Sequence, residues 1–271
     1  MKLFRRSYNE ISDEEAARNA EPRHGVLGFF VTLWEYLSEL FYANLLTVVS
    51  LLPACMLYIL GRVLFQNIWI VGLLTLLGAA PAGAGLCGMA AVATESLRNR
   101  GYAWKETYWK EWKANLKKGI LPGALYLISI GLLSYMLTFA GQMGEVENGT
   151  TVYIMLGILV VMLQTLLGYM TPMMTLLELP TRHYLKNSLL FMAACPKATI
   201  GMMLVSAVLL FGGVVLLLPY TGIYILLLGI AVTELSKVCF VWPRLNEKLR
   251  IEQREKEKHA SEAAQKESEC Q

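Results

Sequence analysis

The chain has 271 residues, of which 55% are hydrophobic and 17% are charged, and its formal net charge is +3. A mean hydropathy of +0.46 excludes an ordinary soluble domain, because the apolar residues fall in runs long enough to cross a bilayer. The small net charge gives no reason to expect a nucleic-acid partner. We therefore expect an all-α polytopic membrane protein with six transmembrane helices.

The chain begins with a polar segment, residues 1–25, which lacks the continuous apolar core of a signal peptide and is expected to be cytoplasmic. The apolar sequence from 26 to 59 is too long for one upright crossing. Glu35 and Glu39 divide it. This division predicts a helix lying in the membrane interface, followed by a first crossing at about residues 40–60.

The second crossing is expected at residues 68–94 and contains a run of very small side chains. In lipid, close approach of helix backbones is a main source of helix association. We therefore predict that this helix is the central packing element of the bundle. Its packing residues form two adjacent strips, namely Ala80, Ala84 and Gly88 on one and Gly83, Cys87 and Ala91 on the other.

Residues 95–118 combine lysine and arginine with aromatic residues at helical spacing, a pattern typical of an interfacial helix on an anionic leaflet. The same helix is also the best candidate surface for a cytoplasmic protein partner. The residues proposed for that surface are Trp104, Tyr108, Trp109, Trp112 and Lys113.

The remaining crossings are expected at about residues 120–140, 152–177, 198–218 and 220–242, with a shorter semi-apolar helix at 184–194. Residues 26–243 would form the transmembrane domain, and residues 244–271 a charged cytoplasmic tail. Lysine and arginine are concentrated in alternate connections, which by the positive-inside rule places both termini in the cytoplasm and the loop around Glu145 outside.

Three asparagines recur at the cytoplasmic starts of the first, third and fifth crossings, at intervals of 71 and 72 residues: Asn44, Asn115 and Asn187. The spacing predicts three copies of one helical hairpin, each preceded by an interfacial helix. Internal repeats are common in transporters, but duplication of a stable packing unit explains the pattern equally well. The asparagines are interpreted as caps or cross-links of helix ends.

The candidate intramembrane polar residues are Glu234, Lys237 and Gln164. An unpaired charge in the membrane would cost about 2.5–3.5 kcal/mol on an insertion scale. Glu234 and Lys237 are three residues apart, so a structural ion pair is preferred, with a proton or ion site as the alternative. Gln164 is expected to form a hydrogen bond between helices.

Cysteines and histidines show no spacing typical of a metal site, and no pairing of a nucleophile with a base is evident. We therefore expect no enzyme activity, no cofactor and no metal.

Three segments, residues 41–46, 80–86 and 97–118, together resemble the YesL-like family of bacterial integral membrane proteins, a family of unknown function. Trp109 and Trp112 stand where that family usually has phenylalanine. The resemblance implies a multi-pass protein of the bacterial cytoplasmic membrane that accompanies oligosaccharide ABC uptake systems. It assigns no ligand or catalytic residue.

These observations lead to two functional hypotheses. The first is a non-enzymatic accessory or regulatory component of carbohydrate ABC uptake, with the lipid bilayer and permease or ATPase subunits as partners. The alternative is an independent small-solute transporter or channel, motivated by the repeat, by prolines within the crossings and by Glu234. The identity of a substrate or signal cannot be deduced from the sequence.

Overall fold

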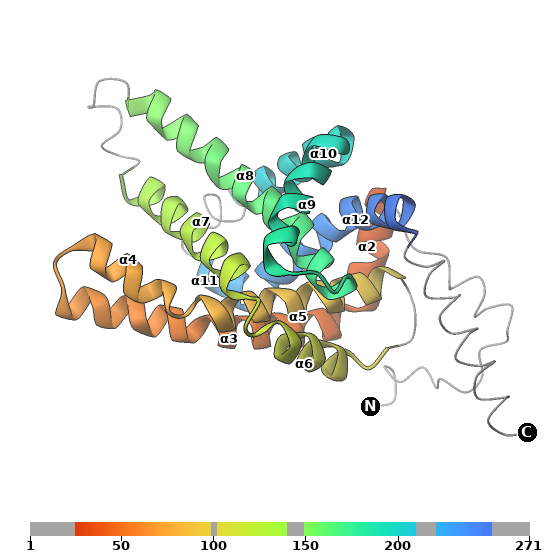
Figure 1. The fold of residues 1–271 in the computed structure, drawn as a ribbon, viewed down its shortest axis with the longest axis horizontal. Coiled ribbons are helices and arrows are strands. Elements are labelled where there is room, and N and C mark those ends of the chain that lie inside the picture. The colour runs from red at the N-terminus through yellow and green to blue at the C-terminus, as the bar shows by residue number, and fades with distance from the viewer. Residues whose placement is uncertain (1–24, 99–101, 140–148, 210–220, 251–271) are drawn as a thin grey trace, which may run out of the picture.

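The computed structural model describes residues 25–98, 102–139, 149–209 and 221–250, and its regular elements in these ranges are all helical, as expected (Figure 1). In chain order they are α2 (Gly25–Glu35), α3 (Leu37–Leu64), α4 (Ile68–Leu76), α5 (Ala79–Arg98), α6 (Trp104–Asn115), α7 (Ile120–Phe139), α8 (Gly149–Leu176), α9 (Thr181–Ala194), α10 (Pro196–Ala207), α11 (Thr221–Tyr224), the π-helical segment η3 (Ile225–Gly229) and α12 (Ile230–Leu249).

Two of the described helices, α3 and α8, are each long and apolar enough to cross a membrane. Three further crossings are possible if bent helix pairs count as one span each: α4 with α5, α6 with α7, and α9 with α10, which bend by 52°, 98° and 102°. The described residues therefore contain between two and five candidate spans. The expected arrangement of six spans in three repeats is not confirmed.

The second crossing was expected to be one helix, but it consists of two, α4 and α5, because the chain bends by 52° between them. Gly78 lies at the break, and a β-carbon added there would be 2.5 Å from the Cα of Ala54 in α3. Only glycine allows this approach. Pro81 lies in the first turn of α5, where a proline removes no helical hydrogen bond.

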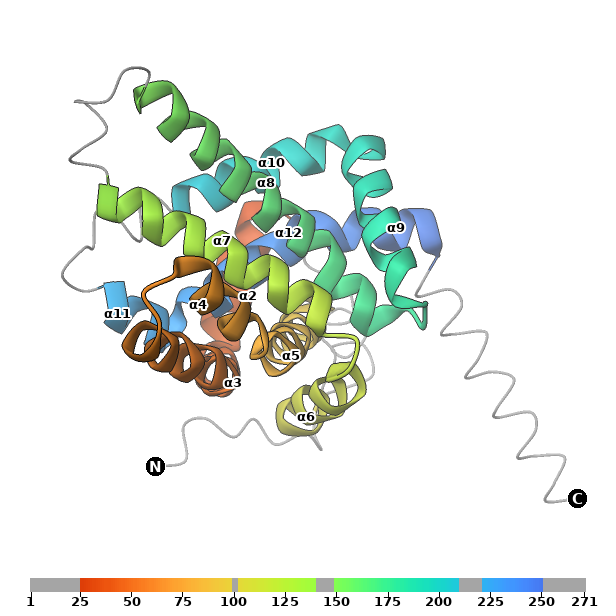
Figure 2. The same cartoon turned by 60° about the vertical axis from the view of Figure 1, so that its left-hand side comes forward.

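Helix α5 lies at the centre of the bundle and contacts α3, α6, α7, α8 and α12, which confirms the predicted packing element (Figure 2). Of the six predicted packing residues, Ala80 is half-buried and the other five are buried. The closest approach is to α7. A β-carbon at Gly83 would lie 1.9 Å from the carbonyl oxygen of Gly119, and one at Gly123 would lie 1.8 Å from that of Ala79.

The last helix differs from the expectation at its C-terminal end. We expected residues 244–271 to form a separate tail, but α12 continues through Pro243 to Leu249. The reason is that Leu245 extends the buried apolar face that begins with Trp242, so these turns pack on the core. The remainder of the predicted tail, residues 251–271, lies outside the described residues.

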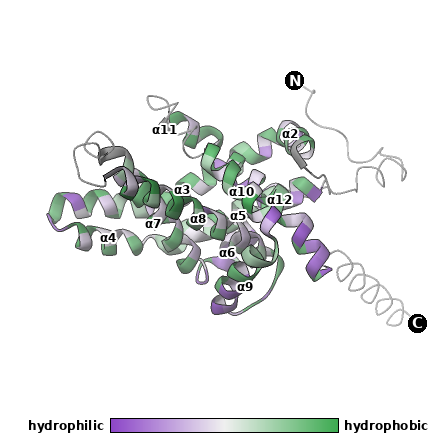
Figure 3. Cartoon of the chain, turned by 90° about the horizontal axis from the view of Figure 1, so that it is seen from above, coloured by the Kyte–Doolittle hydropathy of each residue, from purple (hydrophilic) through white to green (hydrophobic). Residues whose placement is uncertain are grey.

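Polar residues collect at one end of the bundle. Figure 3 shows hydrophilic residues on α6, on α9 and on the last turns of α12, whereas α3, α4, α7 and α8 are mostly hydrophobic. We refer to the end formed by α6, α9 and the last turns of α12 as the α6 end. The turn between α3 and α4 and the first turns of α8 lie away from it (Figure 1).

Helix α2 is separate from α3, as expected from the acidic residues in this region, and the break falls at Tyr36. Its exposed side chains include Leu27, Phe30 and Trp34, which recur every three or four residues on one face. This face suits the apolar side of an interface.

Candidate functional site

A buried ion pair lies at the centre of the candidate site. The ammonium nitrogen Nζ of Lys237 donates a hydrogen bond to Oε1 of Glu234 at 2.8 Å, and the two side chains are only 2% and 3% exposed. Both residues lie on α12, and a spacing of three residues places them on the same helix face. The predicted pair is therefore present in the structure.

The pair extends into a hydrogen-bonded network that joins three helices. Lys237 also donates to Oε1 of Gln164 on α8 at 2.8 Å, and Nε2 of Gln164 donates to the hydroxyl of Ser129 on α7 at 2.8 Å. The hydroxyl of Thr171 on α8 donates to the second carboxylate oxygen of Glu234 at 3.3 Å. All five side chains are buried. The charges are thus compensated inside the protein rather than by water.

Space for the lysine side chain comes from Gly168 on α8. A β-carbon at this position would lie 3.0 Å from Cδ of Lys237 and 2.7 Å from the sulfur of Met202. The absence of a side chain at residue 168 therefore lets the lysine pass along α8 to reach Gln164.

The side chain of Asn44 binds the backbone where the last helix changes from π-helical geometry in η3 to α-helical geometry in α12. Its amide nitrogen donates to the carbonyl oxygen of Ile225 at 3.0 Å, at the start of η3, and its amide oxygen accepts from the backbone nitrogens of Ile230 and Ala231 at 3.1 and 2.9 Å. A π-helical segment changes the i to i−4 hydrogen-bond pattern of a helix. The fully buried Asn44 side chain binds the backbone on both sides of the change.

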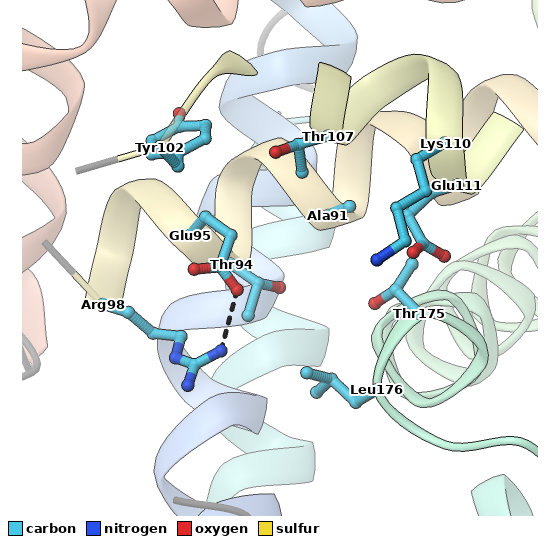
Figure 4. Close-up of a pocket in the computed structure, with 10 residues that line it drawn as sticks. All are labelled: Ala91, Thr94, Glu95, Arg98, Tyr102, Thr107, Lys110, Glu111, Thr175 and Leu176. Atoms are coloured by element: carbon cyan, nitrogen blue, oxygen red, sulfur yellow. Dashed lines mark hydrogen bonds and ion pairs between the residues drawn. The ribbon is translucent and has the colours of Figure 1, made fainter. Parts of the chain in front are cut away.

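A polar cavity of about 320 Å³ opens between α5, α6 and the last turn of α8, at the α6 end. We call it the α6-end cavity. Figure 4 shows charged side chains on both its α5 and α6 walls. It is lined by Ala91, Thr94, Glu95, Arg98, Tyr102, Thr107, Lys110, Glu111, Thr175 and Leu176.

The charged side chains of this cavity differ in their burial and in their partners. Arg98 is buried, binds Oε1 of Glu95 at 2.8 Å and lies 4.9 Å from the ring centre of Trp242. Burial raises the pKa of Glu111 above its ordinary value, although the nearby charge of Lys110 and a hydrogen bond from Asn115 act in the opposite direction. Lys110 itself forms no ion pair with the described residues and is exposed.

The cavity and the buried network are neighbours in the bundle. Thr175, which lines the cavity, lies one helical turn along α8 from Thr171, which binds Glu234. On α5, the buried Cys87 lies one turn from the cavity residue Ala91. The two polar sites are therefore separated by only a short stretch of packed side chains.

Only some of the residues predicted to form a partner surface on α6 are exposed. Trp109 and Lys113 are exposed, whereas Tyr108 is completely buried, so its assignment to this surface was wrong. The ring of Tyr108 fills the space above Gly88, where a β-carbon would lie 2.8 Å from it. Tyr108 faces α5, on which α6 packs, whereas the next residue, Trp109, lies on another face of α6.

The two other tryptophans of this set are half-buried. The indole nitrogen of Trp112 donates to the hydroxyl of Ser50 at 3.0 Å, and Trp104 stacks on Tyr42 with ring centres 5.6 Å apart. Both therefore help to attach α6 to α3.

The three repeated asparagines do not have equivalent roles. Asn115 donates to the backbone and side chain of Glu111 within its own helix, at 3.0 and 3.1 Å. Asn187 is half-buried on α9, and its side chain forms no hydrogen bond with the described residues. We predicted caps or cross-links of helix ends: Asn44 links two distant segments, Asn115 binds the last turn of its own helix, and Asn187 shows neither contact within the described residues.

Sequence reasoning identified Glu234, Lys237 and Gln164 but missed Ser129 and Thr171. Serine and threonine are common inside membrane helices, where their hydroxyls also bind the preceding turn, so nothing in the sequence marked these two. The α6-end cavity was missed because its walls come from segments far apart in the chain. The described residues contain no group of three or more histidine, cysteine or acidic side chains able to hold a metal ion.

The arrangement defines a class: an all-helical protein with helices apolar enough to cross a membrane and a compensated charge network in its core. Comparison with protein-family models, with curated proteins and with solved structures finds no match to this chain. The resemblance to the YesL-like family therefore stays a prediction from the sequence.

Proposed function

We propose that this protein is a non-enzymatic accessory or regulatory component of carbohydrate ABC uptake in the bacterial cytoplasmic membrane. In this proposal the chain crosses the membrane six times with both termini and the α6 end in the cytoplasm. The resemblance to the YesL-like family supports the carbohydrate part and the bacterial membrane. The distribution of lysine and arginine supports the orientation.

The single observation that carries the accessory role is that the buried charged side chains bind one another and nearby polar side chains. Lys237 binds both Glu234 and Gln164, and Thr171 binds the second carboxylate oxygen, so the strongest polar groups in the core bind one another. A route for a polar solute requires groups that face a water-filled passage. The exposed Trp109 and Lys113 on α6 supply a surface on which an ATPase or permease subunit can bind.

Co-purification in a mild detergent tests the accessory role. We expect permease or ATPase subunits of a sugar uptake system to be recovered with the wild-type chain and to be lost with the double substitution Trp109→Ala and Lys113→Ala. Trp69→Ala is the matched control, because Trp69 is also highly exposed but begins α4, away from the α6 end. Recovery of no transporter subunit under conditions that preserve the complex would contradict the proposal.

The alternative function, an independent small-solute transporter, is favoured by one specific observation. The last helix is interrupted at η3, and its next two turns contain Glu234. Interrupted helices with an ionisable residue close to the interruption form the substrate or ion sites of many transporters.

Transport by the purified protein in liposomes tests this alternative. Uptake that requires no partner and is abolished by Glu234→Gln would favour it over the accessory role. Full retention of cellular function by the Glu234→Gln variant would remove its main support.

A further inference from the structure

The α6-end cavity has one acidic and one basic side chain on each of two walls, Glu95 and Arg98 on α5 and Glu111 and Lys110 on α6. Figure 4 shows Thr94 and Glu95 projecting from α5 on one side, while the ammonium group of Lys110 points from α6 into the space between α5 and α8. The lining includes two acidic and two basic side chains: Glu95, Glu111, Arg98 and Lys110. The cavity is therefore close to neutral overall but strongly polar at each wall.

The two bases are not equally available to a ligand. Arg98 is 4% exposed and is held by Glu95 and by the Trp242 ring. Lys110 is exposed and forms no ion pair with the described residues. Burial raises the pKa of the neighbouring Glu111, although the charge of Lys110 acts in the opposite direction.

The acids differ in the same way. Glu95 is 24% exposed in the cavity, and Arg98 binds only its Oε1, at 2.8 Å, so its second oxygen has no hydrogen bond or ion pair within the described residues. The Oε2 atom of Glu111 accepts a hydrogen bond from the amide of Asn115 at 3.1 Å. A ligand with a single charge would pair with only one of these two cavity residues, Lys110 or Glu95. A ligand with both charges, separated by a few atoms, satisfies both walls.

We propose that the α6-end cavity binds a zwitterionic group made of a primary ammonium and a phosphate, with the ammonium at Glu95 and Thr94 and the phosphate at Lys110. A primary ammonium supplies hydrogen-bond donors to a carboxylate, and a lysine is a suitable point charge for phosphate. The volume of about 320 Å³ accommodates a group of this size. Two sources share this chemistry, namely the headgroup of an ethanolamine phospholipid and a free amino-phosphate.

Binding of soluble phosphoethanolamine to the full-length chain in phosphatidylcholine nanodiscs tests the chemistry. We expect saturable binding that is weakened about tenfold or more by Lys110→Gln and by Glu95→Gln, since each substitution removes one charged contact. The matched controls are Lys113→Gln and Glu106→Gln, which change exposed charges on α6 outside the cavity lining and should alter affinity less than about twofold.

Further probes test whether both charges are required. Ethanolamine alone, glycerol phosphate alone and phosphocholine should bind about tenfold more weakly, because each lacks one charge or the ammonium hydrogens. Binding of any of these three probes as tightly as phosphoethanolamine, or equal effects of the four substitutions, would overturn the proposal. If Glu95→Gln unfolds the chain, comparison of Lys110→Gln with the wild type still tests the proposal. Lys110 has no ion pair within the described residues whose loss could destabilise the fold.

Native mass spectrometry distinguishes the two sources. Selective retention of phosphatidylethanolamine over phosphatidylcholine and phosphatidylglycerol, lost in Lys110→Gln, identifies a lipid headgroup. Binding of free phosphoethanolamine with no retained lipid identifies a soluble ligand. Absence of both overturns the proposal. None of these results depends on recovery of transporter subunits, so the accessory role and the ligand site can fail separately.

Discussion

At the scale of single residues, the feature most sensitive to substitution is the mutual compensation of Glu234 and Lys237. Both side chains are almost fully buried, and each keeps a second partner, Thr171 or Gln164. Removing one member of a buried pair leaves the other charge without compensation, which costs more than the pair itself contributes. The network is therefore more sensitive to single than to paired substitutions.

We expect Lys237→Met to destabilise the protein by about 3–5 kcal/mol, because Glu234 then remains charged in the core. The double substitution Glu234→Gln and Lys237→Met should recover a large part of this loss. The midpoint of unfolding by heat in a mild detergent measures both effects. A double variant as unstable as the sum of the two single variants would show that the pair is not coupled.

A pH effect is expected at Glu111. Because burial raises its pKa in the folded protein, the folded state binds this proton more tightly than the unfolded chain does. Stability from this residue is therefore present at low pH and is lost as the pH rises from the ordinary carboxyl range through the raised value. Glu111→Gln should raise the thermal midpoint relative to the wild type at pH 8 and have little effect at pH 4. A gain confined to pH 4 would contradict the burial of this carboxyl.

At the scale of elements, the contact between α5 and α7 depends on glycine in both helices. The carbonyl oxygens of Ala79 and Gly119 occupy the positions that side chains at residues 123 and 83 would need. Helices that approach this closely gain van der Waals contact along their backbones, which is the main attraction available in lipid.

Gly123→Ala should therefore separate α7 from α5 and cost at least about 1–3 kcal/mol. Gly131→Ala is the matched control on the same helix, because a β-carbon there meets no atom within 4 Å. It should leave stability unchanged or raise it by up to about 1 kcal/mol through helix propensity. Thermal unfolding of both variants in detergent compares them, and equal destabilisation would exclude close packing as the cause.

The change from η3 to α12 depends on Asn44 in a similar way. Asn44→Leu would leave three buried backbone groups without this partner, at about 1–3 kcal/mol for each group that stays unsatisfied. Asn187→Leu on α9 is the control and should have a small effect. Hydrogen exchange at Ile230 and Ala231 should increase only in Asn44→Leu. Unchanged exchange there would show that another group can replace the asparagine.

At the scale of the whole molecule, the helices place the polar elements α6, α9 and the last turns of α12 together (Figures 1 and 3). The α3–α4 turn and the start of α8 lie away from them. Such a molecule has one polar end suited to a membrane surface, and α6 and α9 bend by 98° and 102° from the helices that follow them. These bends suit helices that lie along an interface.

Single cysteines and a membrane-impermeant thiol reagent test the orientation in intact cells. Cysteines introduced at Glu145 and Gln66 should react from outside, whereas one introduced at Lys105 should react only after the cells are opened. The five native cysteines of the chain would first be replaced, since Cys55 is exposed. Labelling at Glu145 only after opening would contradict the proposed topology.

The sequence predicted the helical class, the separate helices α2, α6 and α9, and the central packing element, because hydropathy and side-chain size act locally along the chain. The interfacial location of these helices stays a prediction. It also identified Glu234 and Lys237, since charges inside apolar runs are conspicuous and a spacing of three residues places them on one helix face. The repeat of Asn44, Asn115 and Asn187 was visible too, but the spacing did not reveal that their contacts differ.

What the tertiary structure decided was which segments meet. The α4–α5 bend requires contact between Gly78 and Ala54. Tyr108 is buried because α6 packs on α5. The α6-end cavity joins α5, α6 and α8, whose positions are set by long-range packing. Local patterns fix the type of element and its polar face, whereas contacts between distant segments fix bends, networks and cavities, because their energy depends on a partner that the local sequence does not contain.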